Sequence, residues 1–119
     1  MIKHMQYHML RHMENTMAGA NQGFNPRDAI SPRASWQLID VLHEDEHWSM
    51  ALGRWGDGSE WRPVLAQRWN GGAGEKGNPV SHGYATWFVL PDDTYQLYIQ
   101  SEFIPDGKRA FVKDILGIS

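Results

Sequence analysis

The dipeptide Asp57-Gly58 constrains the fold more than any other feature of this 119-residue chain. Both central residues of a type I′ turn need a positive φ, so Asp-Gly between two alternating segments favours a β-hairpin. Large residues alternate with small or polar ones over residues 48–55, and a second strand-length segment follows over 60–69. The apolar run 36–43 and the polar turn 44–47 add a strand before them. The pattern therefore predicts a three-stranded antiparallel meander.

A turn centred on Asp57 and Gly58 pairs Leu52 with Pro63 and Met50 with Leu65. One face of the sheet then holds Trp48, Met50, Leu52, Trp61, Leu65 and Trp69, joined by Ile39 and Val41 if residues 44–47 form a four-residue loop. The opposite face holds Leu38, Asp40, Leu42, Ala51, Gly53, Val64 and Ala66. Both faces need cover, and we expect the three Trp residues to be core. Pro63 lacks an N–H group, so its strand should be an edge or carry a bulge there.

Met and His recur every four residues near the N-terminus, at Met5, Met9 and Met13 and at the His residues that precede them. Residues four apart share one face of a helix, so residues 2–17 are predicted to form an amphipathic helix with a Met stripe. This helix is a plausible cover for the flatter sheet face, from its own chain or from a neighbouring copy. Gly and Pro residues then predict a loop over 18–35.

The second half of the chain is predicted from turn chemistry and periodicity. Residues 70–84 form a long glycine-rich loop, and the run 85–90 is a further strand bounded by Pro91. Residues 92–116 favour two helices, with a hairpin across 105–107 as the alternative. The predicted class is α+β: one domain over 1–119, with an N-terminal helix (1–17), a loop (18–35) and a core (36–119) made of about four antiparallel strands and C-terminal helices.

Charge and composition exclude several classes of function. The chain has 11 Lys and Arg against 14 Asp and Glu, a net charge of −3, so nucleic acid is a poor default partner. The absence of Cys fits a reducing compartment and excludes a thiolate nucleophile. No apolar run is long enough for a bilayer or a secretion signal. We expect a cytoplasmic protein with no membrane contact and no cofactor.

Three motifs resemble functional signatures but lack the required context. Gly72, Gly74 and Gly77 match G-x-G-x-x-G, yet a Pro follows where a helix should begin, and no Lys follows for a phosphate loop. Ser81, His82 and Gly83 resemble half a nucleophile elbow, but Pro79 stands where that motif requires its first Gly. The His residues of the N-terminal segment lack a nearby carboxylate set, so no metal site is predicted.

Five residues are the candidate ligand-binding residues: Asp40, Trp55, Arg62, Arg68 and His82. Asp40 lies between apolar neighbours and needs a partner, for which Arg62, Arg68 or a loop residue is suitable. Trp55 shares a face with both Arg residues, a combination that can bind an aromatic ligand through cation–π contacts. His82 is a possible general base in the glycine-rich loop.

The segments RWNG (68–71), GNPVSHG (77–83) and TWFVLP (86–91) together resemble small uncharacterised bacterial proteins of the hypothetical or mobile-cassette type. The resemblance covers residues 36–92. It implies a bacterial, cytosolic origin and assigns no activity or site residue.

The sequence alone favours a non-enzymatic binding or interaction module that self-associates as a homo-oligomer. The motivation is the apolar helix and an edge strand, together with the lack of a coherent catalytic set. The alternative is a small-molecule-binding protein or enzyme with a pocket under the glycine-rich loop, residues 71–83. Single-stranded nucleic-acid binding by alternating Arg and Trp residues is the weaker alternative.

Overall fold

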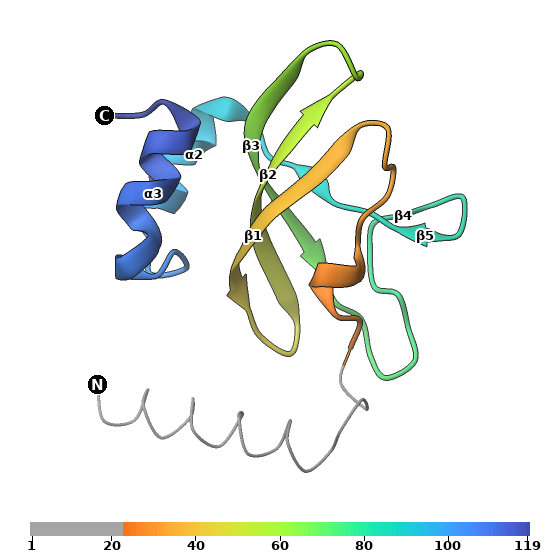
Figure 1. The fold of residues 1–119 in the computed structure, drawn as a ribbon. Helices are drawn as coiled ribbons and strands as arrows, with labels where there is room; N and C mark the ends of the chain where they lie inside the picture. The colour runs from red at the N-terminus through yellow and green to blue at the C-terminus, as the bar shows by residue number, and fades with distance from the viewer. Residues whose placement is uncertain (1–22) are drawn as a thin grey trace, which may run out of the picture.

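The computed structural model of the chain describes residues 23–119 (Figure 1). The helix predicted over residues 2–17 lies outside this range. The described elements are, in order, η2 (Pro26–Asp28), β1 (Trp36–Glu44), β2 (Trp48–Gly56), β3 (Trp61–Trp69), β4 (Val80–Ser81), β5 (Tyr84–Ala85), β6 (Phe88–Val89), η3 (Asp92–Thr94), α2 (Tyr95–Ile99) and α3 (Asp106–Leu116). Strands β1, β2, β3 and β6 form one antiparallel sheet in that order, which confirms the α+β class and the meander.

The register of the β2–β3 hairpin differs from the predicted one by two residues. Leu52 pairs with Leu65 rather than with Pro63, and Gly56 pairs with Trp61. The cause is Asp57, whose side chain accepts hydrogen bonds from the N–H groups of Ser59 (3.0 Å) and Glu60 (3.1 Å). Asp57 therefore opens the turn instead of occupying its centre. A shift of two residues leaves every side chain on its predicted face.

Strand β1 departs further from the prediction because it carries two irregularities. The register shifts between Leu38 and Asp40, and again between Val41 and His43. At each shift β1 contains one extra residue, so the side chains that follow it point to the opposite face of the sheet from the one expected for a regular strand. Asp40 consequently lies opposite Leu52, and Val41 lies opposite Ala51, so both residues are on the face opposite to the predicted one. The loop to β2 contains three residues, 45–47, rather than four.

The segment after β3 is also more divided than predicted. Residues 85–90 were expected as one strand, but the structure has two short strands there: β5 ends at Ala85, and β6 covers only Phe88–Val89. The end of the glycine-rich segment folds into the β4–β5 hairpin, with His82 (φ 52°) and Gly83 (φ 82°) as its two turn residues. The two C-terminal helices are confirmed over the hairpin alternative.

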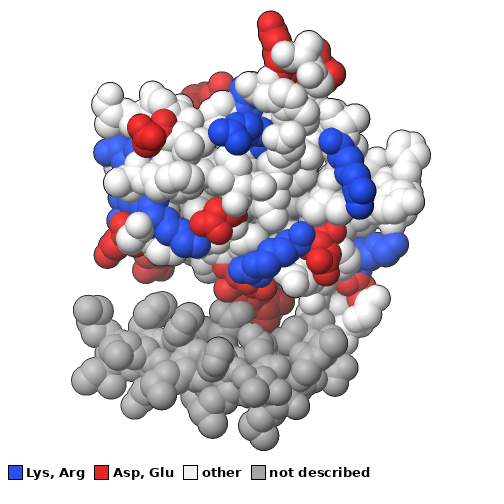
Figure 2. Space-filling view, in the orientation of Figure 1, with Lys and Arg blue, Asp and Glu red and all other residues white. Residues whose placement is uncertain are grey.

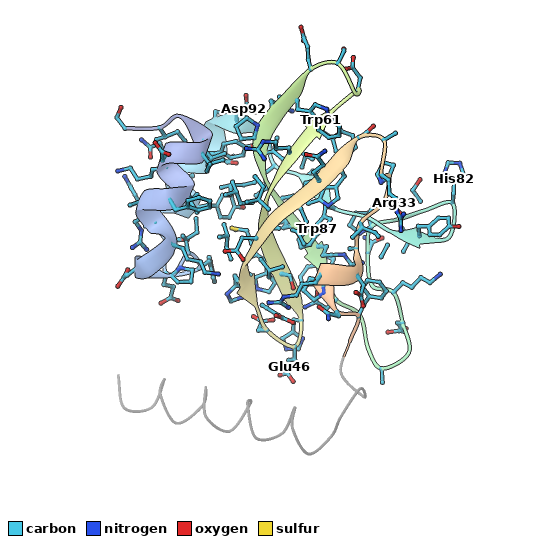
Figure 3. The ribbon with its side chains drawn as sticks, viewed as in Figure 1. Arg33, Glu46, Trp61, His82, Trp87 and Asp92 are labelled. Atoms are coloured by element: carbon cyan, nitrogen blue, oxygen red, sulfur yellow. The ribbon has the colours of Figure 1, made fainter. Side chains whose placement is uncertain are left out.

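The two faces of the sheet are covered by different parts of the chain. Helices α2 and α3 lie on one side, and the β4–β5 hairpin with residues 23–35 lies on the other (Figure 1). On the hairpin side Trp36 stacks on Trp87 with ring centroids 5.7 Å apart, and the Trp87 indole donates to the Ala29 carbonyl (2.7 Å; Figure 3). Gly53 leaves room for the Trp36 ring, because a Cβ there would lie 2.3 Å from it.

Pro63 stands where β3 has a partner on one side only. Strand β6 pairs with β3 at Ala66 and Gln67 and does not extend to Pro63. A residue without an N–H group is tolerated at such a position because no ladder bond is lost. The expectation of a locally unpaired edge is met, although β3 is an interior strand elsewhere.

The predicted core role is wrong for Trp69. Its side chain shares the face of Trp48 but is 60% exposed, whereas Met50, Leu52 and Leu65 are fully buried. Trp69 is the last residue of β3, next to an opening in the cover on the helix side of the sheet. This exposed Trp is the starting point for the functional site.

Candidate functional site

An aromatic cleft lies between one end of the sheet and the connection from α2 to α3. Its volume is about 450 Å³. We call it the aromatic cleft; it is lined by Trp48, Gln67, Arg68, Trp69, Asn78, Pro79, Phe88, Tyr98 and Phe103. Ligand sites of small molecules have volumes of roughly 300–1,000 Å³, so the cleft is large enough to hold one.

The sheet side of the cleft is positioned by the strand register. Trp48 and Trp69 are direct cross-strand partners, and Gln67 pairs with Phe88 on β6. Trp48, Gln67 and Trp69 therefore project from one face, because residues two apart on a strand point the same way. Phe88 is 55% exposed and Trp69 is 60% exposed, so two large aromatic rings meet solvent at this end of the sheet.

The helix side of the cleft is formed by Tyr98 of α2 and Phe103 in the turn that follows. Arg109 of α3 holds that turn by donating to three backbone carbonyls, those of Ile99 (2.7 Å), Ser101 (3.1 Å) and Ile104 (2.8 Å). The Phe103 ring meets the Trp48 ring edge-on, with centroids 4.9 Å apart. This contact joins the two sides at the base of the cleft.

His43 and Asp45 support the Trp48 ring from behind. The His43 ring lies 4.5 Å from Trp48 and 5.2 Å from Phe103, and its Nε2 atom is 3.0 Å from Oδ2 of Asp45. Burial alone would raise the pKa of Asp45, but hydrogen bonds from the backbone of Trp48 and His47 and from His43 leave it below its ordinary value. Asp45 is therefore a carboxylate at neutral pH and fixes the β1–β2 turn.

A second set of hydrogen bonds fixes the end of β3. The backbones of Trp69 and Asn78 form a reciprocal pair, with N–H to O distances of 2.7 and 3.0 Å. Asn70 is 3% exposed; its Oδ1 accepts from the Ser49 hydroxyl (2.9 Å) and its Nδ2 donates to the Asp45 carbonyl (2.9 Å). The chain that carries Trp69 is thus bound to β2, to the β1–β2 turn and to the glycine-rich segment.

The lining of the cleft is almost free of charge. Arg68 is its one ionisable cation, and its guanidinium is directed to the Thr86 carbonyl (3.0 Å) and the Lys76 carbonyl. None of the lining residues that belong to the described part of the chain is acidic. Within residues 23–119 the side-chain amides of Gln67 and Asn78 make no hydrogen bond. The cleft combines aromatic rings with two amide groups available to a ligand.

The five residues predicted to bind a ligand are not brought together. Asp40 pairs with Lys108 of α3 (2.8 Å), a partner that differs from those expected. Trp55 and Arg62 are cross-strand neighbours, and Arg62 pairs with exposed Asp92 (3.2 Å; Figure 3). Arg68 lies six residues further along β3, roughly 20 Å away at strand rise. Of the five, only Arg68 lines the aromatic cleft.

His82 lies at the tip of the β4–β5 hairpin, distant from the sheet (Figure 3). The Ser81 Oγ and His82 Nδ1 atoms are 3.1 Å apart, and both residues are exposed. The positive φ of His82, followed by that of Gly83, is the conformation that a two-residue type I′ turn requires. The hairpin turn accounts for His82 without a catalytic role.

Over the described part of the chain, no group of three His, Asp or Glu residues is placed to hold a metal ion. No helix in residues 23–119 has the length and apolarity needed to cross a membrane. On the face seen in Figure 2, Lys and Arg residues are interspersed with Asp and Glu, and they form no continuous basic track.

Sequence reasoning missed the cleft-lining role of Trp48, Gln67, Trp69, Phe88, Tyr98 and Phe103. The hairpin pattern did place Trp48 and Trp69 on one face. The role of Phe88 was missed because a single strand was expected over residues 85–90. In the structure Phe88 lies in the short strand β6 and is exposed, whereas its neighbour Trp87 is buried.

Comparisons of the chain with protein-family models, with curated proteins and with solved structures found no match. The functional assignment therefore depends on the site itself.

Proposed function

We propose that this chain is a non-enzymatic binding module and that the aromatic cleft is its binding site. The observation that carries the proposal is the exposure of Trp69 and Phe88 beside a cleft of about 450 Å³. Large aromatic side chains are normally buried, and apolar rings that meet solvent in a concave site are typical of ligand sites. The fixed hydrogen bonds around Trp69 and Phe103 make the cleft pre-formed, which lowers the entropic cost of binding.

The absence of a catalytic set in the cleft supports binding rather than catalysis. Among the described residues, its lining contains no carboxylate, His, Ser or Lys side chain that would act as a general base or nucleophile. The two groups considered for catalysis, Asp40 and His82, do not line it. Asp40 is engaged with Lys108, and His82 is a turn residue.

The indole N–H signals of the six Trp residues provide the test. A ¹⁵N-labelled sample is titrated with a collection of small uncharged aromatic compounds. We expect binding compounds to shift the indole signals of Trp48 and Trp69 and to leave those of Trp36 and Trp87 in place. Compounds that move only the Trp36 and Trp87 signals, or a collection without any binder, would refute the proposal. Trp69→Ala should abolish the shifts, and Trp61→Ala is the matched control because Trp61 lies outside the cleft.

Self-association is the second part of the proposal. Leu97 of α2 is 71% exposed and Phe111 of α3 is 47% exposed, which leaves apolar surface outside the cleft. We expect the mass in sedimentation experiments to rise with concentration, and Leu97→Glu to lower it. A second sample lacking residues 1–16 separates the contribution of the predicted N-terminal helix. A monomeric mass for the intact chain at all concentrations would exclude self-association.

A further inference from the structure

We propose that the ligand of the aromatic cleft is a flat, uncharged heteroaromatic compound of about two fused rings, recognised at its edge by the amides of Gln67 and Asn78. This inference rests on the proposed function, because it names the chemistry of the ligand that the cleft binds. Three properties of the lining lead to it: aromatic rings on two sides, two amides without a hydrogen-bond partner among residues 23–119, and, within the same residues, the absence of a charge directed into the cleft.

The aromatic rings favour a flat ligand. Trp48, Trp69 and Phe88 come from the sheet, and Tyr98 and Phe103 come from the helical connection. A ring system that enters between these two groups gains stacking or edge contacts on both of its faces. A flexible aliphatic ligand of the same volume gains no such contact and loses more conformational freedom on binding.

The amides favour a ligand with a hydrogen-bonding edge. Each amide presents one carbonyl acceptor and one NH₂ donor, a pattern that matches the adjacent acceptor and donor on the edge of adenine and similar heterocycles. Gln67 lies two residues before Trp69 on the same sheet face, opposite Met50, and Asn78 is held at the end of β3 by its backbone bonds to Trp69. A purely hydrocarbon ring would cover both amides and leave them unsatisfied.

The charges disfavour ionic ligands. An anion needs an accessible cation, and Arg68 is 2% exposed: its Nε and Nη2 atoms donate to backbone carbonyls, and its Nη1 atom, which has no partner among residues 23–119, is itself buried. A cation benefits from aromatic faces, but no carboxylate among the lining residues of 23–119 offsets its charge. Carbohydrates carry several hydroxyl groups that each need a partner, more than two amides supply.

Adenine and indole form a matched pair of probes, because both are flat bicyclic compounds and only adenine carries the paired donor and acceptor edge. Binding is measured by calorimetry and by the Trp48 and Trp69 indole signals. We expect adenine to bind about tenfold more tightly than indole, the effect of one or two buried hydrogen bonds. Gln67→Leu should remove this preference while indole binding persists, and Trp69→Ala should weaken both probes.

Gln37→Leu is the control variant, because Gln37 is an exposed Gln on β1 outside the cleft. Phe88→Ala provides a second cleft variant if Trp69→Ala fails to fold. Choline and maltose serve as the cationic and carbohydrate probes. Equal binding of adenine and indole, or an adenine affinity unchanged by Gln67→Leu, overturns the inference. Binding of choline or maltose in place of adenine also overturns it, while the proposed function stands. A cleft that binds none of the four, nor any compound of the aromatic collection, overturns both.

Discussion

Arg68 is a buried cation whose partners are neutral groups. Its side chain donates to the Thr86 and Lys76 carbonyls, and its guanidinium carbon lies 5.1 Å from the centroid of the Phe24 ring. Burial lowers the pKa of Arg68 below its ordinary value, although the group stays protonated at neutral pH. Its Nη1 atom has no hydrogen-bond partner among the residues described. Arg68 thus connects β3 to three segments that are distant in sequence.

Replacing Arg68 by Met should therefore lower the free energy of unfolding by about 3 kcal/mol, because the buried Thr86 carbonyl and the part-buried Lys76 carbonyl lose their donor. Arg62→Met is the matched control on the same strand, since the exposed pair of Arg62 with Asp92 is worth about 0.5 kcal/mol or less. Urea unfolding followed by Trp fluorescence measures both. Equal effects of the two substitutions would show that Arg68 does not have this bridging role.

Asp57 gives the hairpin turn a dependence on pH. Hydrogen bonds from the Glu60 backbone, the Ser59 side chain and the Ser59 backbone lower its pKa from 3.8 to about 2. A carboxyl whose pKa is lower in the folded than in the unfolded state stabilises the fold at pH values above its unfolded-state pKa. This contribution is lost as the pH falls towards about 2. As the pH is lowered from 3.8 to about 2, the melting temperature of Asp57→Asn should fall less steeply than that of the wild type. Parallel melting curves across this range would contradict the prediction.

At the scale of elements, two glycines with equal space around them differ in the backbone conformation they require. A Cβ added at Gly58 or at Gly107 would meet nothing within 4 Å. Gly58 has φ +95° in the β2–β3 turn, whereas Gly107 is the second residue of α3. Gly58→Ala should destabilise the protein by about 1 kcal/mol, and Gly107→Ala should stabilise it by about 0.5 kcal/mol. Thermal unfolding of both variants checks the opposite signs, and a shift of the same sign in both would contradict the argument.

The faces of the hairpin were predictable from alternation, but its register was not. Alternation reports which side of the sheet a residue faces, and it is unchanged by a shift of two. The register depended on whether Asp57 opens the turn or lies at its centre, a choice made by hydrogen bonds of its side chain to Ser59 and Glu60. For β1, the irregularity after Leu38 moved Asp40 to the helix side, where Lys108 is its partner.

The cleft was less predictable than the sheet, because it depends on what the helices leave uncovered. Trp48 and Trp69 were correctly placed on one face, yet their pattern does not distinguish a buried Trp from an exposed one. The difference arises from the α2–α3 connection, which brings Phe103 against Trp48 and leaves Trp69 accessible. Contacts between residues separated by more than 50 positions are not encoded in a local pattern.

At the scale of the whole molecule, both layers depend on the same sheet. Lys108 of α3 contacts β1, and Phe103 of the α2–α3 connection contacts β2. The opposite layer is joined to the sheet by Arg68 and Trp36. Loss of either layer would expose buried residues of the sheet, so the two should unfold together. We expect the urea transitions followed by far-ultraviolet circular dichroism and by Trp fluorescence to coincide. Separate midpoints would show that the layers are independent units.

The reciprocal bond between Trp69 and Asn78 closes the glycine-rich segment at its base. Residues 71–76 consequently form a closed loop, and its two ends stay together when residues are inserted between them. Doubling a closed loop adds only about 0.6 kcal/mol of chain entropy. A short reporter peptide grafted after Ala73 would leave the strands in register, and the loop that carries it starts just after Trp69, which lines the aromatic cleft, so this position is suitable for an engineered sensor of cleft occupancy.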